Sequence, residues 1–283
     1  MTERTIAAVL AMALPRLAAA DIPDARREAR LILALALGVD QAVILGHPER
    51  PVPDAVFDRF DKLVTRRAGH EPFSRLLGKR EFWSLDFALS ADTLDPRPDS
   101  ETLIEAVLAE YPDRTAPLRI VDYGTGSGCL LLTLLSELPQ ATGLGIDLSV
   151  GAVETARRNA ESLGLSGRAS FCQGDWSQET QGPADVIVSN PPYIPSEEIA
   201  RLAPEVAHFE PRLALDGGED GLDAYRKLIP VAKERLSPLG IVFFEIGAGQ
   251  TEDVTHLLTE SGFRLKSVRR DLAGIERCLV ATV

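Results

Sequence analysis

The stretch Val121-Asp122-Tyr123-Gly124-Thr125-Gly126-Ser127-Gly128 joins a predicted strand to a predicted helix. Residues 118–122 predict a buried strand, and residues 129–137 predict the helix that follows. Three glycines at alternate positions allow a sharp turn, and they let a ligand approach the main chain without a Cβ in the way. The start of the helix beyond them offers unpaired N–H groups. The stretch therefore predicts a strand–turn–helix unit with a ligand site at the turn.

Strands and helices alternate along the chain from this unit onward. Further strands are predicted at residues 141–147, 169–173, 185–189 and 240–246, and further helices at residues 150–163, 222–236 and 251–261. Two last strand-like runs, residues 264–270 and 275–283, predict an antiparallel edge. Such alternation is typical of a mainly parallel sheet covered by helices on both faces. The predicted fold class is therefore α/β: a Rossmann-like, mainly parallel seven-stranded sheet with an antiparallel edge.

A small helical domain is predicted before the sheet. Asp24 is the expected N-cap of a helix that ends at Gly38, and Asp99 is the expected N-cap of the helix that opens the sheet domain. Residues 82–89 alternate like a strand or a hairpin. We therefore expect a helical domain at residues 1–74, a hairpin connector at 75–95 and the sheet domain at 96–283. The helical domain is either a bundle that binds a partner or a structural cap.

The composition is that of an ordinary globular protein. Of 283 residues, 45% are hydrophobic and 25% are charged. The longest apolar run, residues 31–37, is too short to span a bilayer, and the chain's start lacks the layout of a signal peptide. The widely spaced Cys129, Cys172 and Cys278 predict buried free thiols, with neither a disulfide framework nor a metal site. We expect a cytoplasmic protein without membrane contact.

The net charge argues against a broad nucleic-acid surface. The formal charge is −12, whereas nucleic-acid affinity comes largely from Lys and Arg side chains that neutralise phosphates. A local basic groove is still compatible with this total. We therefore expect no stable nucleic-acid partner.

A second motif, Asn190-Pro191-Pro192-Tyr193, directly follows the predicted strand at residues 185–189. Two consecutive prolines end the strand and stiffen the backbone. A side-chain amide, carbonyls and an aromatic ring then stand at a strand's carboxyl end, the edge where open α/β sheets bind ligands. Such a cluster suits a planar –NH₂ group, whose hydrogens the oxygens accept while the ring packs on its face. Taken alone, the motif is equally compatible with a proline-rich turn and a buried tyrosine.

The ends of two further strands indicate the cofactor. Asp147 ends the second strand, where its carboxylate can accept both hydroxyls of a ribose. Asp175 and Trp176 follow the third strand, where they suit an adenine amino group and a flat ring, although a loop turn and a core aromatic would give the same residues. Dinucleotide-binding proteins need a glycine at the sixth place of the turn, but Cys129 or Leu131 stands there. Four suitable strand ends in a row therefore predict S-adenosylmethionine, with S-adenosylhomocysteine as the product.

The sequence resembles the PrmC/HemK family of class I methyltransferases. The resemblance runs from about residue 77 to the C-terminus, and the helical first 70 residues fit the family's smaller N-terminal domain. Its motifs are Pro96-Arg97-Pro98-Asp99-Ser100-Glu101, the glycine turn, Asn190-Pro191-Pro192-Tyr193, Gly217-Gly218-Glu219-Asp220-Gly221-Leu222, Glu245-Ile246-Gly247 and Asp271-Leu272-Ala273-Gly274. Tyr123, where leucine is commoner, and Asp95, in place of an aliphatic residue, depart from the family pattern without removing a proposed functional group.

The resemblance implies a protein substrate and a set of site residues. The family methylates the side-chain amide of the glutamine in the Gly-Gly-Gln motif of class I peptide chain release factors. By position, the expected cofactor-binding residues are Gly124, Thr125, Gly126, Ser127, Gly128, Asp147, Asp175, Trp176 and Asn190. The expected substrate-binding residues are Asn190, Pro191, Pro192 and Tyr193, of which Asn190, Pro191 and Tyr193 are the expected catalytic residues. Arg97 is a further candidate for substrate binding, which either contacts the substrate or braces the cap. The helical domain is the expected release-factor binding region.

Several functions are still compatible with these motifs. Methyltransferases that modify adenine, cytosine or guanine in DNA or ribosomal RNA carry closely related motifs, and the motif alone does not separate them. A non-catalytic nucleotide-binding module that docks partners also fits, whereas a nicotinamide dehydrogenase is disfavoured by the glycine spacing. Glu245 faces either the pocket or an arginine, and His208 either takes part in catalysis or is a surface histidine.

Overall fold

The computed structural model describes residues 4–176 and 182–283, which divide into two compact units. The first unit is Met1–Gly78 and the second is Lys79–Val283. The division lies at Gly78, whereas the sequence places the end of the helical domain at residue 74. The hairpin that the sequence treats as a connector lies in the second unit. Residues 1–3, part of the start considered for a signal peptide, lie outside the described residues.

The first unit is a helical bundle. Its helices are α1 (Ile6–Ala19), α2 (Ala25–Leu37), α3 (Gln41–Gly46), α4 (Asp54–Ala68) and α5 (Phe73–Leu77). The Asp24 carboxylate accepts the Arg27 N–H at 3.2 Å, and Gly38 takes the left-handed conformation with φ 68°, so both predicted ends of α2 are confirmed. The apolar faces of α1, α2 and α4 meet in one core that includes Ile32 and Phe60. This unit therefore has a hydrophobic core of its own.

A short hairpin opens the second unit. It consists of β1 (Lys79–Phe82) and β2 (Leu85–Ala88), as the alternating pattern predicts. The two residues of its turn, Trp83 and Ser84, have positive φ values of 52° and 61° although neither is a glycine. Trp83 is held there because its backbone N–H donates to Glu101 at 3.0 Å and its indole N–H donates to Glu137 at 2.8 Å.

The core of the second unit is a seven-stranded sheet of order β5-β4-β3-β6-β7-β9-β8. Its strands are β3 (Arg119–Tyr123), β4 (Thr142–Asp147), β5 (Ala169–Gln173), β6 (Ala184–Ser189), β7 (Leu236–Glu245), β8 (Arg264–Arg270) and β9 (Glu276–Thr282). The strands from β5 to β7 pair in parallel, whereas β9 pairs antiparallel with both β7 and β8. The predicted parallel sheet with an antiparallel edge is confirmed.

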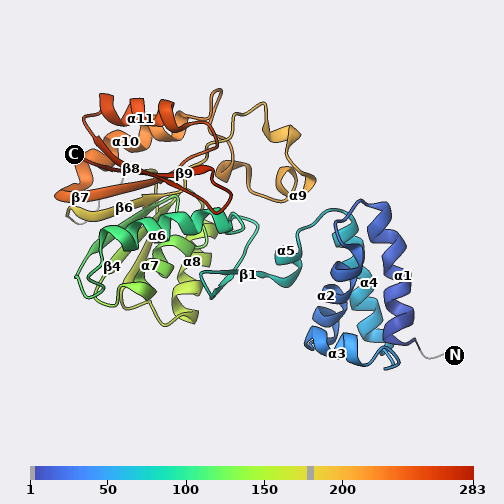
Figure 1. Cartoon of the computed structure of the whole chain (residues 1–283). Coiled ribbons are helices and arrows are strands. Elements are labelled where there is room, and N and C mark those ends of the chain that lie inside the picture. Colours follow the sequence, from blue (N-terminus) through green and yellow to red (C-terminus); the bar gives the residue numbers. More distant parts are fainter. Residues whose placement is uncertain (1–3, 177–181) are drawn as a thin grey trace. The chain divides into compact units, whose positions relative to one another are not determined.

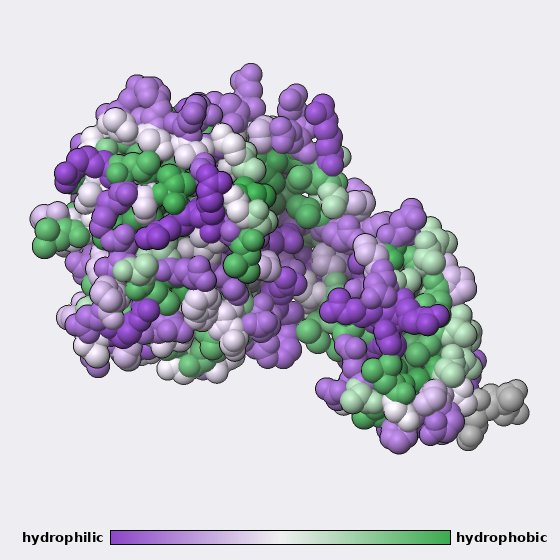
Figure 2. All heavy atoms as spheres, in the orientation of Figure 1, coloured by the Kyte–Doolittle hydropathy of each residue, from purple (hydrophilic) through white to green (hydrophobic). Residues whose placement is uncertain are grey.

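Helices cover both faces of this sheet, as Figure 1 shows. One face packs against α6 (Glu101–Glu110), α7 (Cys129–Glu137) and α8 (Val150–Ser162). The other packs against α10 (Asp223–Arg235) and α11 (Thr251–Glu260). The short elements η2 (Ile199–Arg201), α9 (Pro204–Ala207) and η3 (Arg212–Ala214) lie between β6 and α10 in the chain. Hydrophobic and hydrophilic residues alternate in small groups over the visible face of this unit (Figure 2).

Three local predictions differ from the structure. β7 begins at Leu236 rather than at residue 240, because Leu236 pairs with Ala184 before a register shift. Asp99 is not an N-cap: it lies inside the 3₁₀ turn η1 (Pro98–Ser100), Ser100 stands at the start of α6, and the Asp99 carboxylate pairs with Arg277 at 3.3 Å. Of the three free cysteines only Cys278 is fully buried.

Within residues 4–176 and 182–283, no helix combines the length and the apolar character needed to cross a bilayer.

Candidate active site

The glycine turn and the Asn-Pro-Pro-Tyr motif follow adjacent strands. β3 ends at Tyr123 and β6 ends at Ser189, and the two strands pair in parallel at the point where the chain reverses its direction of strand addition. In open α/β sheets the crevice at this point is where ligands bind. A Cβ built on Gly124 would lie 4.0 Å from the Asn190 carbonyl oxygen. The two motifs therefore meet directly.

The glycine turn needs all three of its glycines. Gly124, Gly126 and Gly128 have φ values of 74°, 55° and 80°, a region that L side chains rarely adopt. Gly128 has a packing role as well, because its added Cβ would lie 3.1 Å from Leu132 and 3.2 Å from Ala156. The Asn159 side chain donates to the Ser127 carbonyl at 2.8 Å and thereby ties the turn to α8.

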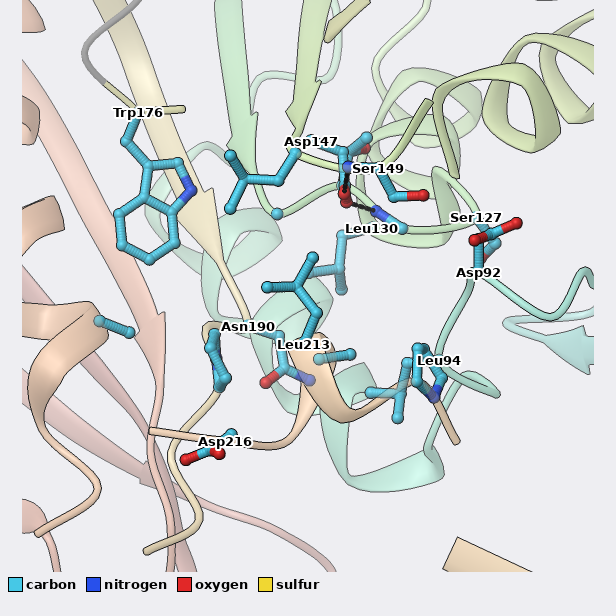
Figure 3. A pocket seen from close by; sticks show the side chains of 18 of the residues that line it. Asp92, Leu94, Ser127, Leu130, Asp147, Ser149, Trp176, Asn190, Leu213 and Asp216 are labelled. Carbon is cyan, nitrogen blue, oxygen red and sulfur yellow. Dashed lines mark hydrogen bonds between the residues drawn. The ribbon is translucent and has the colours of Figure 1, made fainter. Parts of the chain in front are cut away.

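Asp147 faces this turn from the end of β4. Its carboxylate accepts the Gly126 N–H at 2.8 Å and the Ser149 N–H at 2.9 Å, the bonds drawn in Figure 3. Burial raises the pKa of this carboxyl, while the hydrogen bonds from Ser149 and Gly126 act in the opposite direction. Each carboxylate oxygen has a second lone pair, so two hydroxyl groups of a ligand can still donate to Asp147.

Asp122 stabilises the glycine turn through a hydrogen bond from Thr125. It is fully buried, and the Thr125 hydroxyl donates to its carboxylate at 2.7 Å. Burial raises the pKa of Asp122 to about 7. Asp122 does not line the cavity described next, so its direct contact is with the turn.

These strand ends surround a cavity of about 960 Å³. Most of the predicted site residues line it: Arg97, Gly124, Thr125, Gly126, Ser127, Asp147, Asp175, Trp176, Asn190 and Pro192. Figure 3 shows the side chains of Asp147, Trp176 and Asn190 bordering the same space. Gly128, Pro191 and Tyr193 are not part of its lining; Pro191 is buried, and Tyr193 packs against the core beneath β7.

The lining also contains residues that sequence reasoning did not select. These are chiefly Asp92, Leu94, Ser100, Leu130, Leu148, Leu213, Asp216 and Lys227. Ser100 belongs to the quoted Pro-Arg-Pro-Asp-Ser-Glu block, which was the one signal for it. The leucines carry no signal in the sequence, because a leucine that lines a cavity resembles any other leucine of a loop or a helix.

Asn190 is connected to buried groups behind the cavity. Its Nδ2 donates to the Ser100 hydroxyl at 3.2 Å, and that hydroxyl donates to Glu245 Oε2 at 2.6 Å. The Tyr193 hydroxyl contacts Glu245 Oε1 at 3.4 Å. Glu245 therefore lies behind Asn190 and outside the cavity lining, and among the described residues it forms no ion pair with an arginine.

Arg97 and His208, two further candidates from the sequence, lie in different surroundings. The Arg97 guanidinium forms an ion pair with the buried Glu210 at 2.9 Å while it also lines the cavity. His208 is exposed at the end of α9 and lies outside the lining.

The cavity fits an elongated nucleoside with a polar tail. The Asp147 carboxylate suits a ribose, the half-buried Trp176 ring suits a flat base, and the buried Ser127 hydroxyl lacks a well-formed hydrogen-bond partner among the described residues. In residues 4–176 and 182–283, no three His, Cys, Asp or Glu side chains are grouped to hold a metal ion.

A parallel sheet of this order, with a glycine turn facing an acidic strand end, defines a class I methyltransferase, the class that uses S-adenosylmethionine. Residues 8–78 match a family model described as the PrmC N-terminal domain, and residues 115–211 match a methyltransferase domain. The chain is 50% identical to the release factor glutamine methyltransferase of Rhodospirillum rubrum, over 94% of this chain and 81% of that protein. It is 46% identical to that of Bradyrhizobium diazoefficiens, over 99% and 93% of the two chains. The chain belongs to the release factor glutamine methyltransferase family.

A solved structure supports the fold alone. A methyltransferase from Pyrococcus furiosus has a TM-score of 0.53 to this chain at 17% identity, over 77% of this chain and 97% of that one.

Proposed function

We propose that this protein transfers a methyl group from S-adenosylmethionine to the side-chain amide of the glutamine in the Gly-Gly-Gln motif of class I peptide chain release factors. The observation that carries the proposal is the placement of Asn190 beside the glycine turn, in the wall of one cavity. A donor bound at the turn and an amide held by Asn190 would then be neighbours. The relatives that share 46–50% of the sequence are named for this reaction.

The amide nitrogen of glutamine is a poor nucleophile because its lone pair is delocalised into the carbonyl. The Asn190 side-chain oxygen and the Pro191 carbonyl accept its two N–H bonds, which holds the nitrogen and lets it pyramidalise. Tyr193 lies behind the cavity lining, where it packs against the core and helps to exclude water. Positioning and electrostatic complementarity are then the main contributions of the protein. S-adenosylmethionine, when bound, would supply a methyl group on a sulfonium: the N–C bond would form as the S–C bond breaks, S-adenosylhomocysteine would leave as a thioether, and the amide would release one proton.

The other cavity residues hold the cofactor. Asp147 accepts the ribose hydroxyls, and Asp175 and Trp176 bind the adenine through its amino group and its face. The backbone of residues 124–128 leaves room for the amino-acid tail. Each role follows from the type of group that the residue presents to the cavity.

The first unit binds the release factor outside the cavity. Every residue that lines the cavity belongs to the second unit, so a bundle with its own core is free for another task. A release-factor substrate also places the enzyme in the cytoplasm, where translation ends.

The test supplies labelled S-adenosylmethionine with four acceptors in parallel. These are a class I release factor, the same factor with its Gly-Gly-Gln glutamine changed to alanine, duplex DNA and ribosomal RNA. We expect label on the first alone. Label on nucleic acid, or equal label on both release factors, would contradict the proposal.

A further inference from the structure

Glu245 is a buried carboxylate that contacts Ser100, which lines the cavity, and Tyr193, which lies outside the lining. It is the last residue of β7 and is 1% exposed. Oε2 accepts the Ser100 hydroxyl at 2.6 Å, and Oε1 lies 3.4 Å from the Tyr193 hydroxyl. Ser100 in turn accepts from Asn190 Nδ2 at 3.2 Å. One carboxylate is thus linked to Asn190, which lines the cavity, and to Tyr193, which lies next to the motif prolines outside the lining.

Burying the Glu245 carboxylate costs free energy of folding, and this cost calls for an explanation. An ionised carboxyl group away from water is costly unless cations or several donors surround it. Among the residues that the structure describes, no cation lies within ion-pair distance of Glu245. Arg277 is the nearest candidate, but it pairs with Asp99 at 3.3 Å and with Asp271 at 3.1 Å.

The role of Glu245 follows from which group donates and which accepts in the hydrogen bonds that link Asn190, Ser100 and Glu245. A carboxylate only accepts, so the single hydroxyl proton of Ser100 is committed to Glu245. The Ser100 oxygen can then only accept, and the part of Asn190 that faces it must be the NH₂ group. The Asn190 oxygen is thereby directed away from Ser100. The Asn190 side-chain oxygen is the group that accepts an N–H of the substrate glutamine amide.

We propose that Glu245 and Ser100 are positioning residues that fix the orientation of the Asn190 side-chain amide. This inference rests on the proposed function of Asn190 as the acceptor for the substrate amide. Without the carboxylate, the Ser100 hydroxyl can rotate and donate to Asn190 instead. The amide then turns over and presents NH₂ to a substrate group that is itself a donor.

Several titratable or charged groups face Glu245 from the elements packed against it. Tyr193, Tyr225 from α10, Arg277 and Cys278 from β9, Asp99 from η1 and Cys129 from α7 are the titratable or charged neighbours. Burial raises the pKa of Glu245 to about 7, a change that Ser100 and Arg277 partly oppose. Protonated Glu245 can donate a hydrogen bond to Ser100. The Ser100 hydroxyl is then able to donate to Asn190, so the orientation of the Asn190 amide is no longer fixed. The turnover number should therefore fall as the pH drops below about 7.

The test compares E245Q with a matched control. Glutamine has the shape of a protonated glutamate, so we expect E245Q to turn over about tenfold more slowly at pH 8, the equivalent of one charged hydrogen bond. Its KM for S-adenosylmethionine should be unchanged, and its rate should no longer depend on pH between about 6 and 8. The control is Y225F, which removes a buried hydrogen bond of 2.7 Å to the Glu245 backbone carbonyl and leaves the carboxylate intact. We expect Y225F to lose stability but to keep its turnover number and its pH profile.

A second variant covers the case in which E245Q folds poorly. S100A removes the link itself, so it should lower the turnover number as E245Q does. The double variant should lose no more than either single one. Full turnover in S100A, an unchanged pH profile in E245Q, or an equal loss of turnover in Y225F would each overturn the inference.

One readout is independent of the release factor. The side-chain NH₂ signals of Asn190 can be followed by NMR in the full chain during a pH titration. We expect them to shift near pH 7 in the unmodified chain and to remain constant in E245Q. If no release factor is methylated but this shift is present, the proposed function fails while the orientation of Asn190 stands. If methylation occurs and the signals do not respond to Glu245, the inference fails alone.

Discussion

Asn190 is the residue at which the two halves of the site meet. Its backbone carbonyl lies beside Gly124, its side chain lines the cavity, and its Nδ2 is held by Ser100. The residue therefore needs a definite rotamer as well as an amide group. A side chain held from behind in this way is pre-organised, so little has to be rearranged when the substrate arrives.

We expect Asn190→Ala to lower the turnover number by more than about 100-fold, because it removes an acceptor that acts where the reacting nitrogen must be held. S-adenosylmethionine binding should change only slightly, since the turn and Asp147 are untouched. Isothermal titration with the cofactor and a release-factor methylation assay separate the two effects. Near-normal turnover would show that another group holds the amide.

At the scale of elements, the turn between β3 and α7 combines two constraints. Its backbone needs positive φ at three positions, and Gly128 also lies against Leu132 and Ala156. The buried Asp122 beneath the turn adds an electrostatic constraint. A substitution can therefore destabilise the turn either by adding a Cβ at a glycine or by changing the charge of Asp122.

Gly128→Ala should destabilise the protein more than Gly164→Ala does. Both glycines have positive φ, 80° and 70°, but an added Cβ meets neighbouring atoms only at Gly128. The shared backbone strain amounts to about 1–2 kcal/mol, and the crowding at Gly128 adds to it. Chemical denaturation of both variants measures the difference. Equal losses would mean that α7 shifts to admit the methyl group.

Asp122 should make stability depend on pH. Its pKa of about 7 in the folded chain exceeds the ordinary value of 3.8, so the folded chain binds more protons between these values. The free energy of unfolding must then fall as the pH rises from about 4 to about 7. Asp122→Asn should reduce this slope without abolishing it, because the raised pKa of Glu245 contributes in the same direction. Denaturant unfolding across this pH range checks the sign; an unchanged slope would exclude Asp122 as its source.

At the scale of the whole molecule, the protein consists of two units with separate cores. The cavity belongs to the second unit alone. Cofactor binding and partner recognition can therefore be assigned to different parts of the chain.

S-adenosylmethionine should protect only the second unit. At 100 times its dissociation constant, a ligand stabilises the unit that binds it by about 2.7 kcal/mol. Hydrogen exchange followed by mass spectrometry on the full chain should show slower exchange in peptides from residues 118–150 and unchanged exchange in α1 to α4. Equal protection of the helical bundle would show that the two units are energetically coupled.

Much of this architecture is predictable because its signals are local. Strand and helix alternation identifies the sheet, and Gly and Pro restrict the backbone through their own covalent structure. The start of β7 and the place of Asp99 are not predictable in this way. Leu236 joins the strand through Ala184, and Asp99 is held by Arg277, so both depend on partners far away in the chain.

The sequence by itself determined the fold class, the turn at residues 121–128, the strand-ending motif at residues 190–193 and the family to which they point. The fold class, the turn and the motif follow from the conformational preferences of neighbouring residues, whereas the family follows from the resemblance of the motifs. Only the tertiary structure decided which groups meet behind Asn190. Ser100 is 90 positions from Asn190 and 145 positions from Glu245 along the chain. They come together because β6 and β7 pair side by side while η1 lies against their carboxyl ends, and such a contact depends on strand order rather than on any local preference.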